Sequence, residues 1–133
     1  MVVDTSAVVS ILLEDADAAR FAEALLSAPE RIMSRVTYVE CAFVMQGRAP
    51  IRGLRALERL VEGLPIALID FDAIQMRMAV EARCRYGKGS GHPAGLNLGD
   101  CFSYALAKSR DLPLLYKGED FARTDIKAAF MPK

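Results

Sequence analysis

The sequence predicts an α/β fold in which a central, mostly parallel β-sheet is flanked by helices on both sides. Short apolar runs of strand length alternate along the chain with longer segments of helical spacing. Such alternation implies right-handed crossovers, which make the strands parallel and cover both faces of the sheet. A chain of 133 residues, 53% of them hydrophobic, suits a single domain spanning residues 1–133.

Four apolar runs have the length of strands, and turn or cap residues follow each of them. We expect these runs to form the central sheet. The predicted strands are residues 1–4, 31–34, 65–69 and the apolar run that ends at Tyr116.

The first two helices have clear end signals. Thr5 or Ser6 can cap a helix over residues 5–13, because the apolar stripe begins directly afterwards. A second helix over residues 15–27 keeps helical spacing until Pro29, which cannot continue it.

The two middle helices are bounded in the same way. Ser34 can cap a helix over residues 35–46, and Gly47 stands where that helix should stop. Pro50 can open a helix over residues 51–63, since the first helical position needs no backbone N–H.

The last two long helices flank a glycine-rich loop. Asp70 or Asp72 can cap a helix over residues 73–86. Residues 87–99 then form the loop, and the next helix begins at Asp100, directly before an apolar run.

Net charge excludes few functions. The 17 basic and 17 acidic residues cancel, so the overall field neither attracts nor repels a polyanion. Four arginines would nevertheless share one helix face, as either a polyanion-binding ridge or a solvated surface. They are Arg48, Arg52, Arg55 and Arg59.

The sequence predicts a cytoplasmic protein. No apolar run reaches the roughly 18 residues of a membrane-spanning helix, and the N-terminus lacks the features of a secretory signal. The three cysteines are odd in number and widely separated, which predicts free thiols that behave as small hydrophobes. They are Cys41, Cys84 and Cys101.

Acidic residues fall where strands end and helices begin. Asp4 ends the first strand, Glu40 lies about two turns into a helix, and Asp100 begins another. Glu119 and Asp120 follow the last strand. In a parallel α/β fold these positions share the edge of the sheet where ligands usually bind.

Each of these acids also has a structural interpretation. Asp4 and Asp100 could be helix caps, worth about 1 kcal/mol each. Glu119 and Asp120 could belong to a solvated turn. Glu40 is harder to explain in this way, because an apolar face would leave its carboxylate flanking a core without a partner. That face comprises Val36, Val39 and Phe43.

Taken together, the acids predict a metal site. Clustered carboxylates repel one another unless a cation compensates them. Oxygen ligands select a hard ion such as Mg²⁺, with Mn²⁺ as a substitute, and the lack of histidine or cysteine argues against zinc. Such ions favour phosphodiester hydrolysis.

Four segments resemble the signatures of PIN-domain ribonucleases, in particular the VapC-type toxins of toxin–antitoxin pairs. They are "MVVDTSA", "VE" within a helix, "LNLGDCFSYALAK" and "LLYKGEDFARTDI". The resemblance implies an Mg²⁺ site on the family's four acids, which here correspond to Asp4, Glu40, Asp100 and Asp120.

Supporting roles also follow from this resemblance. Thr5 or Ser6 would place a hydroxyl near the metal or its water, and Asp125 is a weaker candidate for an outer role. The family's last acid commonly follows Asn or Asp, whereas this chain has Glu119, so whether Glu119 or Asp120 faces the ion stays open.

The resemblance further implies an activity and partners. We expect Mg²⁺-dependent cleavage of single-stranded RNA by in-line attack of water, leaving a 5′-phosphate and a 3′-hydroxyl. We also expect a homodimer and inhibition by a VapB-type antitoxin, a segment of which blocks the site. The sequence does not identify the RNA that is cut.

Basic residues near the glycine-rich loop are candidates for RNA contacts. Arg83, Arg85 and Lys88 could bind phosphates or form ordinary surface. His92 stands beside a proline in the loop and is expected to have a loop or packing role.

Two alternatives compete with a nuclease. Asp70 at the end of the third strand and Lys117 after the last strand would suit a receiver-like phosphoacceptor domain, although the first strand supplies one acid rather than a pair. A nuclease-like fold kept only as a binding module is the second alternative.

Overall fold

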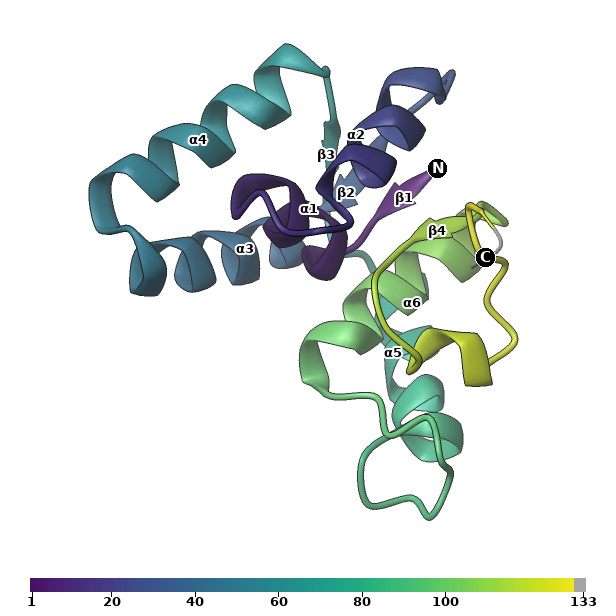
Figure 1. Cartoon of the computed structure of the whole chain (residues 1–133). Helices are drawn as coiled ribbons and strands as arrows, with labels where there is room; N and C mark the ends of the chain where they lie inside the picture. Colours follow the sequence, from purple (N-terminus) through teal and green to yellow (C-terminus); the bar gives the residue numbers. More distant parts are fainter. Residues whose placement is uncertain (131–133) are drawn as a thin grey trace.

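The computed structural model describes residues 1–130, and within them four parallel strands form one sheet (Figure 1). Their order across the sheet is β3-β2-β1-β4, so the first strand is central. Val2 is in register with Ile32 on one side and with Leu114 on the other. The strands are β1 (Val2–Val3), β2 (Ile32–Ser34), β3 (Ala67–Ile69) and β4 (Leu114–Leu115).

Helices cover both faces of the sheet, which confirms the predicted α/β fold (Figure 1). Side chains of α1 to α4 enter the core on one face, and those of α5 and α6 enter the core on the other. A short 3₁₀ helix, η1 (Phe121–Arg123), follows β4. The helices are α1 (Thr5–Leu12), α2 (Ala18–Ser27), α3 (Arg35–Arg48), α4 (Pro50–Gly63), α5 (Ala73–Tyr86) and α6 (Leu98–Arg110).

The two central strands and β4 are apolar because both of their faces are buried. Val2 and Leu114 point into the core beneath α5 and α6, whereas Val3 and Leu115 point into the core beneath α1 to α4. This alternation follows from the two-residue repeat of an extended chain.

The ends of the first two helices differ from the prediction. Asp4, not Thr5 or Ser6, is the N-cap of α1. The second helix begins at Ala18 rather than at residue 15. Asp15 stays outside it, where its carboxylate accepts a hydrogen bond from the Ser10 hydroxyl at 2.5 Å.

The caps predicted for the middle helices are confirmed. The Ser34 hydroxyl accepts from the Val36 N–H at 3.2 Å, and Pro50 is the first residue of α4. α3 continues past the predicted stop to Arg48. A Cβ at Gly53 would lie 2.7 Å from the Met45 carbonyl oxygen, so the glycine allows α3 and α4 to pack closely.

The remaining sequence expectations are met in part. Asp72 caps α5, but Asp70 does not, since its carboxylate pairs with Arg35 instead. All three cysteine thiols are free, and Cys84 is exposed rather than core-like. Within residues 1–130, no helix combines the length and apolar character that crossing a membrane requires.

Candidate active site

Asp4 lies at the end of β1 with only 3% of the residue exposed. One carboxylate oxygen, Oδ2, accepts from the backbone N–H of Ser6 at 3.0 Å and from its hydroxyl at 2.6 Å. The other, Oδ1, accepts from the Ser103 hydroxyl of α6 at 2.5 Å. The interpretation of Asp4 as a helix cap is therefore confirmed. The same carboxylate is also held by α6, a helix far along the chain.

Glu40 projects from α3 towards the start of α1, where the Thr5 hydroxyl donates to its Oε1. Burial raises the pKa of the Glu40 carboxyl and the charge of Asp4 raises it further, against the effect of the Thr5 hydrogen bond. The prediction that Glu40 flanks a buried core is wrong, since Val39 is 46% exposed and Phe43 is 70% exposed. Glu40 instead borders an apolar surface.

Asp100 is the third residue of α6 and forms a capping box with Asn97. Its carboxylate accepts from the Asn97 N–H at 3.0 Å, while its own N–H donates to the Asn97 side chain at 2.9 Å. Helix α6 therefore begins at Leu98 rather than at Asp100. Burial raises the pKa of Asp100 to about 7 despite the Asn97 hydrogen bond, and nearby charges contribute to the rise, namely Asp4, Asp120 and Glu40.

Gly99 lets Glu40 approach the start of α6. A Cβ built at Gly99 would overlap the Glu40 carboxylate, because Oε2 and Oε1 both lie closer than any normal contact. A side chain at this position would force the Glu40 carboxylate to move. The glycine therefore sets how close α3 and α6 bring their acids.

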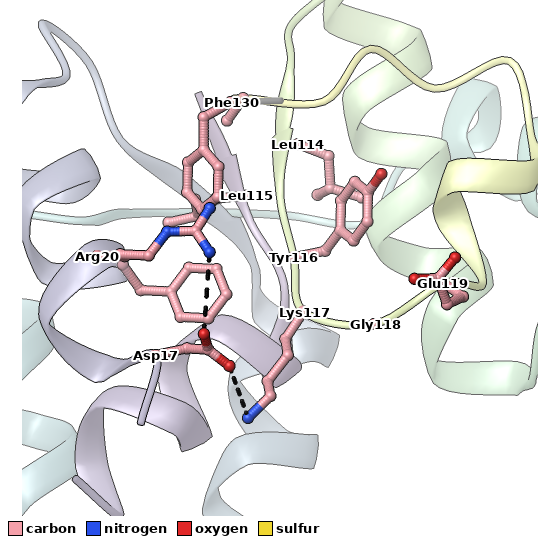
Figure 2. Close-up of a pocket in the computed structure, with 11 residues that line it drawn as sticks. Asp17, Arg20, Leu114, Leu115, Tyr116, Lys117, Gly118, Glu119 and Phe130 are labelled. Carbon is pink, nitrogen blue, oxygen red and sulfur yellow. Dashed lines mark ion pairs between the residues drawn. The ribbon is translucent and has the colours of Figure 1, made fainter. Parts of the chain in front are cut away.

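The loop after β4 carries Glu119 and Asp120 and is attached to α1 and to the turn before α2. The Lys117 N–H donates to the Ser6 hydroxyl at 2.9 Å. The Lys117 ammonium lies 2.7 Å from Asp15 and 3.2 Å from Asp17. Figure 2 shows the Lys117 and Glu119 side chains leaving this loop in different directions.

Of the two acids in the loop, Asp120 is the one whose charge reaches Asp100. Its charge contributes to the raised pKa of Asp100. Glu119 contributes instead to the raised pKa of Tyr116, after the larger effect of burial. Asp120 is at the N-cap position of η1, but its side chain makes no cap hydrogen bond.

The four predicted acids lie near one another at one edge of the sheet, since the charges of the other three all raise the pKa of Asp100. We call this edge the carboxyl edge (Asp4, Glu40, Asp100 and Asp120). They do not form a closed cage: within residues 1–130, no group of three or more Asp, Glu, His or Cys side chains is arranged to hold a metal ion. Three of the four carboxylates accept hydrogen bonds from the protein instead. Mutual repulsion of like charges favours such an open arrangement.

The predicted RNA-contacting residues lie at the end of α5 and in the loop that follows. The Arg83 guanidinium donates to the Lys88 carbonyl, and the Arg85 guanidinium stacks 4.9 Å from the centre of the Tyr86 ring. His92 accepts from the Ala94 N–H through Nδ1 at 3.0 Å and packs edge-on against Tyr86, which agrees with a loop role. Arg83 and Lys88 line an apolar groove that reaches Asn97 and Leu98.

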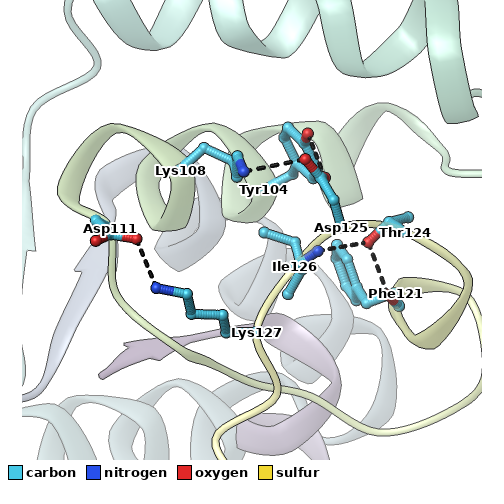
Figure 3. Close-up of polar contacts among 8 residues, drawn as sticks. All are labelled: Tyr104, Lys108, Asp111, Phe121, Thr124, Asp125, Ile126 and Lys127. Atoms are coloured by element: carbon cyan, nitrogen blue, oxygen red, sulfur yellow. Dashed lines mark hydrogen bonds and ion pairs between the residues drawn. The ribbon is translucent and has the colours of Figure 1, made fainter.

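Asp125 lies away from the carboxyl edge, so the outer role predicted for it is not supported. Its carboxylate accepts from the Tyr104 hydroxyl at 2.7 Å and pairs with the Lys108 ammonium at 3.0 Å (Figure 3). Asp125 therefore anchors the C-terminal segment to α6.

The receiver-like alternative is wrong. β3, which precedes Asp70, and β4, which precedes Lys117, are at opposite edges of the sheet. Asp70 pairs with Arg35 at 2.5 Å, and Lys117 pairs with Asp15 and Asp17. The aspartate and lysine of a phosphoacceptor site would have to meet.

The four arginines do not share a single helix. Arg48 ends α3, whereas Arg52, Arg55 and Arg59 are exposed on α4. Among residues 1–130, none of the four forms an ion pair. α3 and α4 form a hairpin that extends away from the strands (Figure 1).

Sequence reasoning missed the hydroxyls beneath Asp4 and the role of Gly99. Ser103 and Thr37 are both fully or almost fully buried, with 0% and 1% of each residue exposed. The available signal was a polar residue inside an otherwise apolar helical run, as in the "CFSYALA" segment. Buried polar side chains need partners, so such positions are worth examining.

Comparison with known proteins assigns the chain to a family of known fold. The family model described as PIN domain matches residues 1–127. The structure of VapC20 from Mycobacterium tuberculosis, a sarcin-ricin loop cleaving toxin, superposes with a TM-score of 0.78 over 98% of both chains at 17% identity. A toxin–antitoxin complex from Klebsiella pneumoniae gives a TM-score of 0.66 at 20% identity, covering 91% of this chain and 89% of that one.

Sequence relatives narrow the class. Ribonuclease VapC28 of Mycobacterium tuberculosis is 45% identical over 129 residues, covering 97% of both chains. Ribonuclease VapC of Mycolicibacterium smegmatis is 48% identical over 128 residues, covering 96% of this chain and 98% of that protein. The chain therefore belongs to the VapC ribonucleases of the PIN domain family, which confirms the resemblance seen in its sequence motifs.

Proposed function

We propose that this ribonuclease binds Mg²⁺ at the carboxyl edge, with Mn²⁺ as a substitute, and hydrolyses phosphodiester bonds of RNA there. The observation that carries the proposal is that burial and neighbouring charges raise the pKa of both Glu40 and Asp100. Within residues 1–130, none of the four acids at this edge pairs with a lysine or arginine. A bound cation would relieve this unfavourable charge.

The residues present fit such an ion by their chemistry. Every candidate ligand at the carboxyl edge is an oxygen, as hard divalent cations require. Asp120 lies on an exposed loop, and Glu40 is held by one hydroxyl, so both carboxylates can turn without disturbing the core. Direct ligation by Asp4, Glu40 and Asp100 would therefore require their carboxylates to come closer together than they lie here, with Asp120 completing the site or orienting water.

The protein's own groups would then divide the work. When bound, Mg²⁺ would supply positive charge to the scissile phosphate and lower the pKa of water. Ser6 holds Asp4 and the Lys117 backbone together, which keeps the Asp120 loop beside the site. Thr5 holds Glu40, and Asp120 would accept a hydrogen bond from the water that attacks in line. The products would carry a 5′-phosphate and a 3′-hydroxyl.

Basic side chains would position the RNA rather than react with it. Arg83, Arg85 and Lys88 are all exposed, and two of them line the groove that leads to the start of α6. Contacts of this kind bind the phosphate backbone without reading its sequence.

The direct test is RNA cleavage by the Asp100→Asn variant. The change keeps the size of the side chain but removes a charged ligand, so we expect Mg²⁺-dependent cleavage to fall by about 10³-fold, the equivalent of several kcal/mol of transition-state stabilisation. Chelation of metal should abolish cleavage by the parent protein. Cleavage by Asp100→Asn at the parental rate would refute the metal site and favour a fold retained for binding.

A homodimer has a suitable surface beside the carboxyl edge. Bulky apolar side chains of α3, α5 and the start of α6 are exposed, although soluble monomers rarely expose large contiguous patches. Phe43 and Leu98 line one groove together with Glu40, and Leu98 also lines the neighbouring groove. This apolar face comprises Val39, Phe43, Met76, Val80 and Leu98, which are 46 to 76% exposed.

We infer that a second copy of the chain covers this apolar face, since a two-fold dimer buries the same patch on both subunits. Phe43→Asp should shift the protein from dimer to monomer in sedimentation experiments. Leu26→Asp is the matched control, because Leu26 is 66% exposed on α2, outside this face. Equal molecular masses for the two variants would contradict the assignment.

Neutralisation by a VapB-type antitoxin is the remaining part of the proposal. The similar fold of the Klebsiella pneumoniae toxin–antitoxin complex supports it. The uncompensated carboxyl edge is a surface to which a basic antitoxin segment could bind. Addition of the partner should inhibit cleavage and protect this edge from hydrogen exchange.

A further inference from the structure

Beneath the carboxyl edge, a buried chain of hydroxyls leads from α3 through α6 to Asp4. The Ser103 hydroxyl donates to Asp4 Oδ1 at 2.5 Å. The hydroxyls of Thr37 and Ser103 lie 3.3 Å apart. Asp4, Ser103 and Thr37 are 3%, 0% and 1% exposed, so water is largely excluded from this chain of contacts.

The direction of these hydrogen bonds follows from the number of protons. A serine hydroxyl has one proton to donate, and an ionised carboxylate can only accept. Because the Ser103 O–H donates its one hydrogen bond to Asp4, the Ser103 oxygen can only accept from Thr37. Thr37 therefore donates to Ser103, and both hydroxyls have a fixed orientation.

The second oxygen of Asp4 is held from the opposite side. Ser6 donates to Oδ2 through both its N–H and its hydroxyl. With Ser103 on Oδ1, the Asp4 carboxylate has donors on both oxygens and cannot rotate without losing one of them. Its plane is thereby fixed before any ion binds.

We propose that Ser103 is a positioning residue for Asp4, and that Thr37 fixes the direction of the Ser103 hydroxyl. The inference rests on the proposed metal site. In that site, Ser103 acts through Asp4 alone and touches neither the ion nor the RNA. Hydrogen bonds to ligating carboxylates raise metal affinity because the ligand is already oriented when the ion arrives.

The test compares Ser103→Ala with the parent protein in Mn²⁺ binding without RNA, measured by isothermal titration calorimetry. We expect affinity to fall by about 10- to 100-fold, as is typical when a group supporting a metal ligand is removed. The Mg²⁺ concentration for half-maximal cleavage should rise by a similar factor. KM for RNA at saturating Mg²⁺ should not change, because Ser103 does not contact the substrate.

Three further variants separate positioning from a general effect on the fold. Ser109→Ala removes a hydroxyl from the same helix, where it donates to the Leu106 carbonyl, and should leave Mn²⁺ affinity unchanged. Thr37→Val removes the second hydroxyl at nearly constant size and should weaken Mn²⁺ binding several-fold. Thr37→Ser retains that hydroxyl and should restore parental affinity.

The outcomes distinguish this inference from the metal site on which it rests. Parental Mn²⁺ affinity in Ser103→Ala would overturn the positioning role, whatever the melting temperature of that variant. If Ser103→Ala does not fold, parental affinity in Thr37→Val overturns it instead. Should Asp100→Asn also bind Mn²⁺ and cleave RNA as the parent does, the metal site itself is wrong.

Discussion

Acidic side chains lie both at the carboxyl edge and where the C-terminal segment packs against α6, but their carboxylates have different partners. Asp125 of the C-terminal segment accepts from a tyrosine and pairs with Lys108, and Asp111 at the end of α6 pairs with Lys127 of that segment at 2.8 Å (Figure 3). At the carboxyl edge, the partners are neutral hydroxyls and backbone N–H groups, and the nearby charges are other acids.

The two regions differ accordingly in the direction of their pKa shifts. Burial alone would raise the pKa of Asp125, but hydrogen bonds from Tyr104 and Lys108 lower it, and Lys127 lowers that of Asp111. Burial and like charges raise the pKa of Glu40, and bring that of Asp100 to about 7. The acids of the C-terminal region are compensated within the fold, whereas the uncompensated acids mark the carboxyl edge as a candidate site for a ligand.

Among the changes that test this difference between the two regions, Gly99→Ala should have the largest effect. The new methyl group would displace the Glu40 carboxylate, so we expect RNA cleavage to fall by about 10²-fold, as a misplacement of roughly 1 Å can cause. Stability should not fall, since alanine is favoured over glycine in a helix by about 1 kcal/mol. Measured on one preparation, the cleavage rate should therefore fall while the melting temperature does not.

Gly47→Ala is the matched control, because Gly47 lies on the same helix as Glu40 and a Cβ there would meet nothing within 4 Å. We expect a more stable protein with parental cleavage. Equal activity in the two variants would show that the close approach of Gly99 and Glu40 does not matter for catalysis.

The Gly99 contact also marks the limit of what the sequence could predict. Alternating apolar runs predicted the parallel sheet, and the topology of such sheets then placed Asp4, Glu40 and Asp100 at one edge. Contacts between side chains were beyond this reasoning. Ser103 and Asp4 are separated by 99 residues and meet only because α6 packs beside β1.

The exposure of Phe43 was mispredicted for a related physical reason. Periodicity shows that α3 has an apolar stripe, but not whether this chain or another covers it. The caps at Ser34 and Pro50 were predictable because they depend on neighbours within a few residues. Local interactions can be derived from sequence, whereas packing partners far along the chain cannot.

A smaller effect is expected on the stability of the metal-free protein as pH changes. The pKa of Asp100 is raised in the folded state, so the folded protein binds more protons than the unfolded chain between about pH 4 and pH 7. The contribution of Asp100 to the free energy of unfolding is therefore lost as pH rises through this range. The lowered pKa values of Asp111 and Asp125 act oppositely, and their contribution is lost as pH falls below about 4.

Thermal melts in the presence of a chelator would measure both changes, the fall in stability from about pH 4 to pH 7 and the fall below about pH 4. Asp100→Asn should flatten the decrease towards neutral pH and raise the melting temperature near pH 8 by about 4 °C for each kcal/mol regained. Asp125→Asn should leave that decrease in place and weaken stability by about 0.5–1 kcal/mol because its hydrogen bonds are removed. Identical pH profiles for the two variants would remove the distinction between the regions.

The smallest expected effect concerns the arginines of α4, which lack ion-pair partners within residues 1–130 and lie in neither acidic region. If they bind RNA phosphates, replacing Arg52, Arg55 and Arg59 by alanine weakens RNA binding. The slope of log affinity against log salt should then become shallower by about 0.7 for each phosphate that is no longer neutralised in single-stranded RNA. A parental slope would assign these side chains to solvated surface, leaving Arg83, Arg85 and Lys88 as the candidate phosphate-binding residues.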